Sequence, residues 1–279
     1  MSLLQDLVLI ITGSASGIGL ATATQALDQG ARILGVDVSS APASLSEHPN
    51  YKFLQGDLTH ESTPKQVVET CIKEFGGRID GLLNIAGIMD RNASVDSLSD
   101  DMWDRCIAIN LSAPVKLMRE VIPIMREQKS GSIVNVGSKA ATSGAASGVA
   151  YTASKSTTLF VVQPKMLHGG INKKGFVAMR FARAVSLNTI LEDHRGYAVS
   201  SSSIPGVPTG IVQASDPTTW DKDALGTMSL IHEAHASDRR EGLGVEAENI
   251  ADCLIFLVSS HSKRINGSVI PVDNAWSVI

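Results

Sequence analysis

Apolar residues recur along the first two-thirds of the chain in short, uninterrupted runs that alternate with segments of helical periodicity. The runs are rich in β-branched residues and show no polar alternation, which indicates strands buried on both faces, as in a parallel sheet. We expect these strands at residues 7–12, 32–36, 51–55, 81–85 and 132–136. Helical patterns fill the intervals, at 17–29, 62–75, 99–109 and 114–128. Alternating strands and helices predict right-handed crossovers and an α/β fold with a doubly wound parallel sheet.

The last third of the chain follows this pattern less regularly. A helix is expected at 246–259 and a final strand at 268–272. A stretch with glycines and a proline at 163–175 and a serine-rich stretch at 192–203 interrupt regular elements as irregular insertions. A polar excursion at 207–244 is expected to cross the sheet edge on the substrate side. No internal repeat or convincing boundary divides the chain, so we predict a single domain across all 279 residues.

The two insertions have two interpretations. The helix that carries Tyr151 meets Pro164, and a proline inside a helix costs roughly 3 kcal/mol. Helical character resumes at 176–182, and 185–191 resembles a sixth strand. The insertions are either surface loops, which add little closure entropy, or translated non-coding segments of a gene model. Sequencing the transcript distinguishes the two, because a spliced message that still encodes both segments excludes the second.

Composition excludes several classes of function. The 24 Lys and Arg against 28 Asp and Glu give a net charge of -4, without the basic footprint that nucleic acid or acidic lipid requires. Cys71, Cys106 and Cys253 are scattered without metal-ligand spacing, which suggests reduced thiols of the cytosol. No apolar run reaches the length of a bilayer span, and the N-terminus lacks the pattern of a signal peptide. We therefore expect a cytoplasmic protein without a metal, nucleic acid or membrane partner.

The first expected strand runs directly into a glycine-rich turn, and a helical pattern follows. Glycines at such a turn let the backbone bend tightly and approach a pyrophosphate, whose charge lies at the helix N-terminus. A purely structural turn is the alternative, but the strand–turn–helix context favours a dinucleotide. The residues expected to bind it are Gly13, Ser16, Gly17, Ile18 and Gly19.

Polar or small residues follow the next three strands, at the edge where ligands of such sheets bind. The Asp37 carboxylate can accept both ribose hydroxyls of the adenosine half and would repel the extra phosphate of NADP, so we expect NAD. Asp57 and Leu58 are expected near the adenine amino group. Asn84 and Ala86 are expected beside the cofactor. The alternative for each position is an ordinary turn at a strand end.

A phenol and an ammonium lie four residues apart, at Tyr151 and Lys155. On a helix both would project from one face. A free tyrosine has a pKa of about 10, and a nearby ammonium lowers that pKa and makes the phenol useful for proton transfer. Ser138 ends the fifth strand, where its hydroxyl can hold a substrate oxygen. Asn110 can position a water that links Lys155 to solvent. A solvated helix face is the alternative for the pair taken alone.

Together these features resemble the short-chain dehydrogenase/reductase family, from residue 5 to about 160 and again from Pro205 to the end. The resemblance implies a Rossmann fold and a homo-oligomer, a dimer or tetramer, unless the insertions block the helix that commonly forms the interface. It implies Tyr151 as general acid/base and Lys155 as its activator and ribose ligand. It further implies that Val207 and Thr209 contact the nicotinamide carboxamide and phosphate region.

The expected function is the transfer of a hydride between a nicotinamide cofactor and a carbonyl or secondary alcohol, in specialised metabolism. The expected pocket walls, at Met89, 140–144 and 207–244, are mostly small or apolar and suit a hydrophobic substrate. The alternative is a catalytically impaired dinucleotide-binding protein, a sensor or scaffold, in which the insertions misplace residues 205–209. The intact Ser138, Tyr151 and Lys155 argue against it, because a pure binder needs none of the three.

Overall fold

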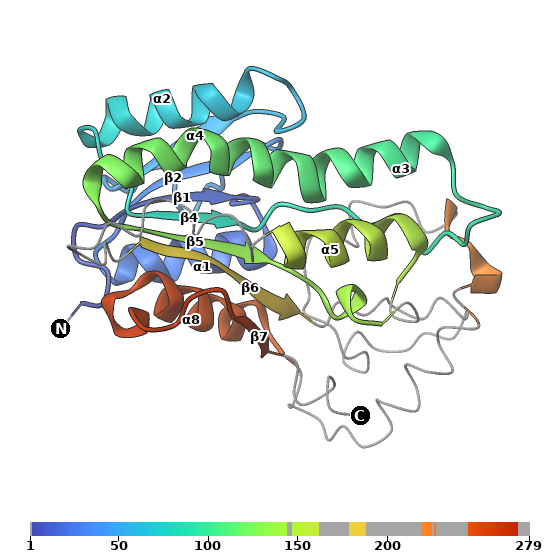
Figure 1. The fold of residues 1–279 in the computed structure, drawn as a ribbon. Helices are drawn as coiled ribbons and strands as arrows, with labels where there is room; N and C mark the ends of the chain where they lie inside the picture. The colour runs from blue at the N-terminus through green and yellow to red at the C-terminus, as the bar shows by residue number, and fades with distance from the viewer. Residues whose placement is uncertain are drawn as a thin grey trace.

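Seven parallel strands form one sheet in the order β3-β2-β1-β4-β5-β6-β7 (Figure 1). The computed structural model describes residues 2–143, 147–161, 179–187, 219–224, 226 and 245–272. The strands are β1 (Val8–Thr12), β2 (Arg32–Asp37), β3 (Tyr51–Gln55), β4 (Gly81–Asn84), β5 (Gly131–Val136), β6 (Met179–Leu187) and β7 (Val269–Val272). The helices are α1 (Gly17–Asp28), α2 (Thr63–Phe75), α3 (Asp100–Ile107), α4 (Ala113–Gln128), α5 (Val149–Val161) and α8 (Ala247–Val258). A π-helical turn η1 (Ala108–Ser112) joins α3 to α4, and the 3-10 turns are η2 (Lys139–Ala141) and η5 (Ser260–Ser262).

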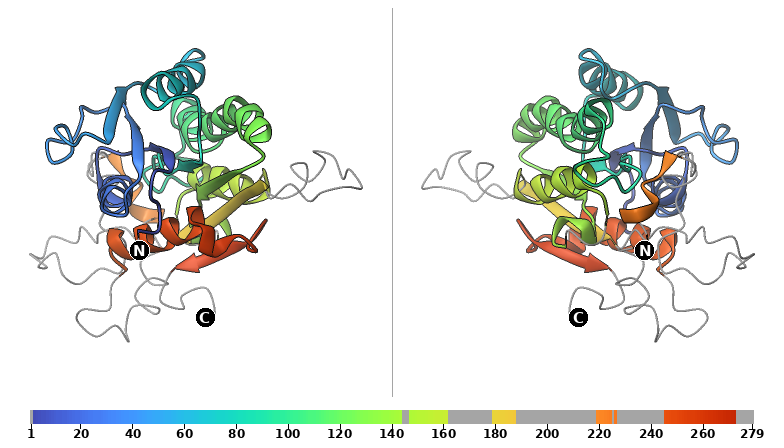
Figure 2. Two further views of the ribbon diagram at one scale, coloured as in Figure 1. Left: turned by 90° about the vertical axis from the view of Figure 1, so that its left-hand side faces the viewer. Right: turned by 90° about the vertical axis from the view of Figure 1, so that its right-hand side faces the viewer.

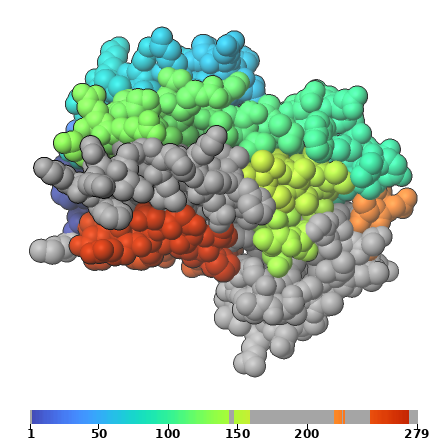
Figure 3. All heavy atoms as spheres, viewed as in Figure 1, coloured from blue at the N-terminus to red at the C-terminus, as the bar shows by residue number. Residues whose placement is uncertain are grey.

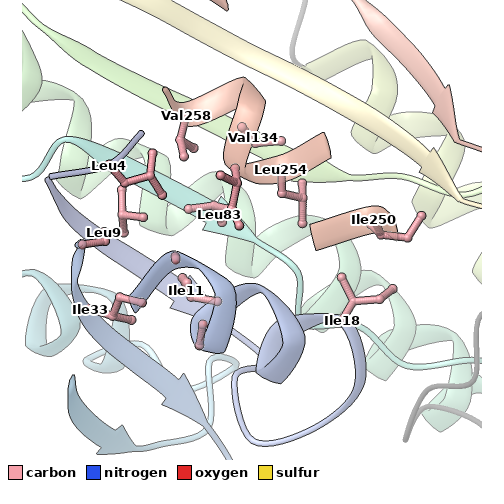
Figure 4. Packing of buried hydrophobic residues seen from close by; sticks show 14 of the residues in the cluster. Leu4, Leu9, Ile11, Ile18, Ile33, Leu83, Val134, Ile250, Leu254 and Val258 are labelled. Atoms are coloured by element: carbon pink, nitrogen blue, oxygen red, sulfur yellow. The ribbon is translucent and has the colours of Figure 1, made fainter. Parts of the chain in front are cut away.

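Helices cover both faces of the sheet, as the unbroken apolar runs predict. On β1, Leu9 and Ile11 point to the face covered by α1 and α8, and Val8 and Ile10 point to the face covered by α2 and α4. Figure 2 shows the two helical layers on either side of the sheet. Figure 4 shows the core between the sheet, α1 and α8, in which Leu9 and its neighbours are fully buried. The predicted α/β class with a doubly wound parallel sheet is confirmed.

One expected element is wrong. The helical character expected at 176–182 does not hold for residues 179–182, because Met179–Leu187 forms β6, with Val185 paired to Val136 of β5 and to Ile270 of β7. Alanine, methionine and arginine are good helix formers, so local propensity favours the wrong element here. Pairing with strands on both sides overrides that propensity. The expected sixth strand therefore begins at residue 179, and its register shifts between Ser132 and Val134 of β5.

The architecture positions a site at one edge of the sheet. The carboxyl ends of the parallel strands β1, β2, β4 and β5 lie at the same edge of the sheet. The switch point of the topology lies between β1 and β4, because β2 and β3 are added on one side of β1 and the later strands on the other. The insertions at 163–175 and 192–203 lie outside the described residues, as does most of the excursion at 207–244. Within the described ranges, no helix is both long and apolar enough to cross a bilayer.

Candidate active site

The glycine-rich turn after β1 is built for close backbone packing. Gly13 and Gly17 have positive φ angles of 71° and 50°, which favour glycine. A Cβ on Gly13 would lie 3.0 Å from the Ala86 Cα, and one on Gly19 would lie 1.9 Å from the Gly13 carbonyl oxygen. The turn therefore presses against both the end of β4 and the start of α1, and side chains on Gly13 or Gly19 would force these elements apart.

The N-terminus of α1 keeps its peptide N–H groups without a side-chain cap. Ser16 occupies the N-cap position in extended conformation and makes no cap hydrogen bond. By contrast, the Ser99 hydroxyl at the start of α3 accepts a hydrogen bond from the Met102 peptide N–H. Unpaired N–H groups at a helix N-terminus are suited to an anionic group. The turn and the helix start therefore fit the pyrophosphate of a dinucleotide.

The carboxylate after β2 is oriented from both sides by peptide groups. Asp37 Oδ2 accepts a hydrogen bond from the Ala15 peptide N–H (3.0 Å), and Oδ1 accepts one from the Ser39 peptide N–H (2.9 Å). Asp37 is thus tied to the glycine-rich turn, as a residue that faces the adenosine ribose would be. Each oxygen keeps further lone pairs for a hydroxyl donor.

The residues after β3 and β4 make local contacts that the sequence did not reveal. Asp57 Oδ1 accepts hydrogen bonds from the peptide N–H and the hydroxyl of Thr59. The hydrogen bond from the peptide N–H is the main reason that the pKa of the Asp57 carboxyl is lowered. The Asn84 amide points into the sheet, where its Nδ2 donates to Asn135 Oδ1 (2.7 Å). Ala86 is held by its peptide N–H, which donates to the Thr12 hydroxyl (3.1 Å). Asn84 therefore joins β4 to β5, and Ala86 contacts the glycine-rich turn.

Tyr151 and Lys155 lie on the first turns of α5 and are almost fully buried, with 2% and 4% of their surfaces exposed. The Lys155 Nζ lies 5.7 Å from the centroid of the Tyr151 ring and donates to the Val136 carbonyl oxygen at 3.0 Å. Burial lowers the pKa of Lys155 to about 8, because desolvation penalises the ammonium. The expected pairing of phenol and ammonium on one helix face is therefore present in a dry environment.

Ser138 connects the end of β5 to η2, which packs beside α5. The residue is 1% exposed, and its Oγ accepts a hydrogen bond from the Ala140 peptide N–H (3.2 Å). Helix α5 packs against η2, and the Ser156 hydroxyl donates to the Ala141 carbonyl (2.9 Å). These contacts fix the segment that carries Ser138 against the helix that carries Tyr151.

Asn110 lies in the π-helical turn η1, a local widening that is frequent at functional sites. Its amide clamps the Ile88 backbone, with Oδ1 accepting from the peptide N–H and Nδ2 donating to the carbonyl, both at 2.9 Å. Nδ2 also donates to Ser154 Oγ at 3.0 Å. A Cβ on Gly87 would lie 3.1 Å from Asn110 Oδ1 and 3.4 Å from Lys155 Nζ. Asn110 and Lys155 therefore converge on the space beside Gly87.

Part of the excursion lies against the loop after β4. Trp220 is buried, and the Asp221 peptide N–H donates to the Arg91 carbonyl (3.2 Å). The Asp221 carboxylate accepts hydrogen bonds from the hydroxyls of Ser94 (2.8 Å) and Ser97. These bonds hold the pKa of the Asp221 carboxyl well below its usual range.

Comparison with known proteins settles the family. A family model described as short chain dehydrogenase matches residues 7–163. The chain belongs to the short-chain dehydrogenase family. Membership makes the protein an oxidoreductase, and the family and its fold imply a nicotinamide dinucleotide as cofactor.

Curated and solved relatives of this short-chain dehydrogenase match it along its length. The short chain dehydrogenase adrF of Penicillium roqueforti is 74% identical over 279 residues, covering 100% of both chains. Asnovolin H dehydrogenase nvfC of Aspergillus novofumigatus is 61% identical, again over 100% of both. The structure of levodione reductase matches with a TM-score of 0.75 and 26% identity over 98% of each chain. The structure of aldohexose dehydrogenase from Thermoplasma acidophilum shares the fold, with a TM-score of 0.74 and 24% identity. The match covers 100% of this chain and 96% of that one.

The structure thus places four residues that the sequence singled out, Asn110, Ser138, Tyr151 and Lys155, on neighbouring elements at one edge of the sheet. Val207 and Thr209 lie outside the described residues. Sequence reasoning missed Gly87, whose lack of a side chain lets Asn110 Oδ1 and Lys155 Nζ approach it closely, and it missed Asp90, whose carboxylate accepts a hydrogen bond from the Tyr151 peptide N–H. An acid that closes the apolar stretch at 85–89, after β4, is the signal that could have indicated Asp90. Among the described residues, no group of three or more metal-ligating side chains is present.

Proposed function

We propose that this short-chain dehydrogenase interconverts a secondary alcohol and a ketone, with NAD as its cofactor. The observation that carries the proposal is the buried Lys155 ammonium beside the Tyr151 ring, next to the turn that holds Ser138. A tyrosine with a neighbouring ammonium in a dry site is suited to proton transfer near neutral pH.

In this proposal, each residue has one role in the reduction direction. The Ser138 hydroxyl donates a hydrogen bond to the carbonyl oxygen of the substrate and orients it. The Tyr151 phenol gives its proton to that oxygen as it becomes an alcohol. Lys155 stabilises the resulting phenolate and binds the nicotinamide ribose. Oxidation uses the same residues in reverse. The bound nicotinamide dinucleotide would supply or accept the hydride.

Proton resupply follows from the space beside Gly87. After reduction, Lys155 can pass a proton to the Tyr151 phenolate and take one in return from a water held between its Nζ and Asn110 Oδ1, since both atoms border that space. Asn110 is immobilised by its bonds to Ile88, so it can hold a water without rearranging. The water would connect the phenolate of Tyr151, through Lys155, to solvent.

The choice of NAD rests on Asp37. Its carboxylate is fixed by the Ala15 and Ser39 peptide groups, and the 2'-phosphate of NADP would bring negative charge toward it.

Val207 and Thr209 are proposed to contact the nicotinamide carboxamide and phosphate region. Gly13, Ser16, Gly17, Ile18 and Gly19 are proposed to bind the pyrophosphate, with Asp57 and Leu58 near the adenine and Asn84 and Ala86 lining the cofactor's path.

We propose a hydrophobic substrate from specialised metabolism. Met89 and Ala140, two of the expected pocket walls, are buried apolar residues. A relative of 61% identity carries the name asnovolin H dehydrogenase, which supports a fungal specialised metabolite as the substrate class.

We further propose a cytoplasmic homo-oligomer. Figure 3 shows α4 and α5 at the surface on one face, as helices that form a subunit interface must be.

A screen of ketones and secondary alcohols against NAD(H) and NADP(H), with Tyr151→Phe as the control protein, tests the proposal. Turnover of an apolar ketone or alcohol with a preference for NAD(H), absent in the control, would support it. Tight NADH binding without turnover on any compound would indicate the sensor or scaffold function. A preference for NADP(H) would contradict the role given to Asp37.

A further inference from the structure

A carboxylate without a counter-ion is buried directly under the catalytic helix. Asp90 is 0% exposed, and its Oδ2 accepts a hydrogen bond of 2.9 Å from the peptide N–H of Tyr151. No salt bridge to Asp90 exists among the residues that the structure describes. Burial raises the pKa of the Asp90 carboxyl, and the peptide N–H groups of Tyr151, Ala150, Asp90 and Asn92 oppose that rise. Backbone dipoles therefore take the place that a cation would have.

The chain around Asp90 is shaped to hold the carboxylate against α5. Arg91 and Asn92, directly after it, both adopt the left-handed conformation, with φ of 60° and 56°. Non-glycine residues adopt this conformation uncommonly, and asparagine is among those that tolerate it best. Two consecutive ones fold the loop back, so that the Val149 peptide N–H, at the start of α5, donates to the Ala93 carbonyl at 3.0 Å.

Gly148 leaves the space that the carboxylate occupies. A Cβ at this position would lie 2.4 Å and 2.6 Å from the two carboxylate oxygens of Asp90, and 2.7 Å from the Ala93 peptide nitrogen. Real Cβ atoms do not approach other atoms so closely, so the carboxylate and any side chain at 148 exclude each other. The loop at 90–93 therefore packs directly against the backbone of Gly148, just before α5 begins.

Side chains just after Tyr151 also anchor α5 to its surroundings. Lys155 donates to the end of β5, and Ser154 accepts from Asn110, which also clamps Ile88 in the loop after β4. Both anchors lie one turn beyond the reactive tyrosine. The hydrogen bond that the Tyr151 peptide N–H donates to Asp90 acts on the backbone of Tyr151 itself, so it fixes the Cα from which the phenol projects.

We propose that Asp90 is a positioning residue, which holds the backbone of Tyr151 against the loop after β4 so that the phenol stands in register with Lys155 and Ser138. The proposal rests on the proposed function, because its main readout is turnover. It assigns to Asp90 no contact with substrate or cofactor. A displacement of about 1 Å in a reacting group can lower a rate about a hundredfold, so the loss of this bond should be visible in kcat.

Asp90→Ala and Asp90→Asn separate the hydrogen bond from the fold. Asparagine keeps an oxygen that can accept from the Tyr151 peptide N–H, and alanine does not. We expect kcat to fall roughly ten- to a hundredfold in the alanine variant, with the Kd for NADH within about twofold, and to recover most of its value in the asparagine variant. An asparagine variant as slow as the alanine variant would overturn the hydrogen bond as the cause.

Asp80→Ala is the matched control. Asp80 is also a largely buried carboxylate that accepts a peptide hydrogen bond, from Val8 (2.9 Å), but it lies at the opposite edge of the sheet. Its loss should lower the melting temperature and leave the kcat of the folded protein unchanged. If Asp90→Ala behaves in the same way as Asp80→Ala, Asp90 is merely structural and the proposal is wrong.

Two further measurements keep the test decisive. Should Asp90→Ala fail to fold, Gly148→Ala displaces the carboxylate by another route, and wild-type kcat in that variant overturns the proposal. Should the wild type turn over no substrate, the proposed function fails separately. Tyrosine 13Cζ NMR then reports the pKa of Tyr151 directly, since the chain has three tyrosines and Tyr151→Phe assigns the signal. An unchanged Tyr151 pKa in Asp90→Ala would also overturn the proposal, because a displaced phenol loses its fixed relation to the Lys155 ammonium.

Discussion

Buried polar side chains at the two ends of the parallel sheet differ in how completely they are hydrogen-bonded. At the amino end, just before β4, the Asp80 carboxylate accepts hydrogen bonds from the Val8 peptide N–H (2.9 Å) and from the Arg78 guanidinium (2.9 Å). The Gln128 amide exchanges two hydrogen bonds of 2.8 Å with the Ile79 backbone. The polar atoms of both side chains are hydrogen-bonded, as is usual for buried polar groups whose role is to stabilise the fold.

At the carboxyl end, polar groups are buried with fewer partners. In the described part of the chain, seven buried side-chain nitrogen or oxygen atoms have no hydrogen-bond partner. Five of the seven belong to residues at the end of β4, in the loop after it, or just before α5: Asn84, Asp90, Asn92 and Ser147. Lys155 is buried there without a carboxylate partner among the described residues, and burial lowers its pKa to about 8. Unsatisfied buried groups destabilise a fold, so their concentration at one edge indicates an edge arranged for chemistry.

Tyr151→Phe should have the largest effect on the carboxyl end. The change removes only the hydroxyl, so the apolar ring still fills its buried position beside Lys155. Because general acid–base catalysis contributes about 10²- to 10⁴-fold, we expect kcat to fall by roughly 10³-fold or more and the Kd for NADH to stay within about twofold. Steady-state kinetics and a fluorescence titration of NADH measure the two. Retained turnover would show that this edge does not use the phenol.

The same contrast explains what the sequence could predict. Strands, the glycine-rich turn and the Tyr151/Lys155 pair follow from local periodicity and spacing, and the structure has them within a residue or two of the expected ranges. The sixth strand was expected at 185–191, but the start of β6 at Met179 was missed because it depends on pairing with β5, which no local pattern records. Asp90 was missed because its partner, the Tyr151 peptide N–H, lies 61 residues away. The Asn84 amide likewise turned inward to Asn135, 51 residues away.

The titration of Lys155 should make stability rise with pH. In the unfolded chain a lysine holds its proton up to about pH 10.5, and in the folded protein Lys155 releases it near pH 8. Between these values the unfolded state binds more protons, so the free energy of unfolding increases with pH in that window. The full gain is at most about 3.4 kcal/mol, for a shift from 10.5 to about 8 at about 1.36 kcal/mol per pKa unit.

Lys155→Met provides the control for that rise. Methionine fills a similar volume without a charge, so urea denaturation of the variant between pH 8 and 10.5 should lack the wild-type increase. Other lysines titrate alike in both proteins and cancel in the difference. Parallel pH profiles for wild type and variant would mean that Lys155 is not held in a dry site, and the two ends of the sheet would differ less than proposed.

Gly87→Ala should have a smaller effect at the same edge. The added Cβ would lie 3.1 Å from Asn110 Oδ1 and 3.4 Å from Lys155 Nζ, which is tight contact without severe overlap. It would occupy the space proposed for the relay water. We expect kcat to fall about tenfold, corresponding to 1.4 kcal/mol, with a solvent isotope effect larger than that of the wild type. Unchanged kcat would place the proton path elsewhere.

Arg78→Ala should have the smallest effect, at the amino end. The Arg78 side chain is 53% exposed and Asp80 keeps its hydrogen bond from Val8, so the loss should be about 0.5–1 kcal/mol of unfolding free energy, less in high salt. Lys65→Ala, which removes the exposed i,i+4 partner of Glu69 at 3.7 Å, is the matched control and should cost less still. Urea denaturation measures both, and kcat should stay at the wild-type value in each. A tenfold fall in the kcat of Arg78→Ala would mean that the amino end transmits to the catalytic edge through β4, and the division of the sheet into a stabilising end and a reactive end would have to be given up.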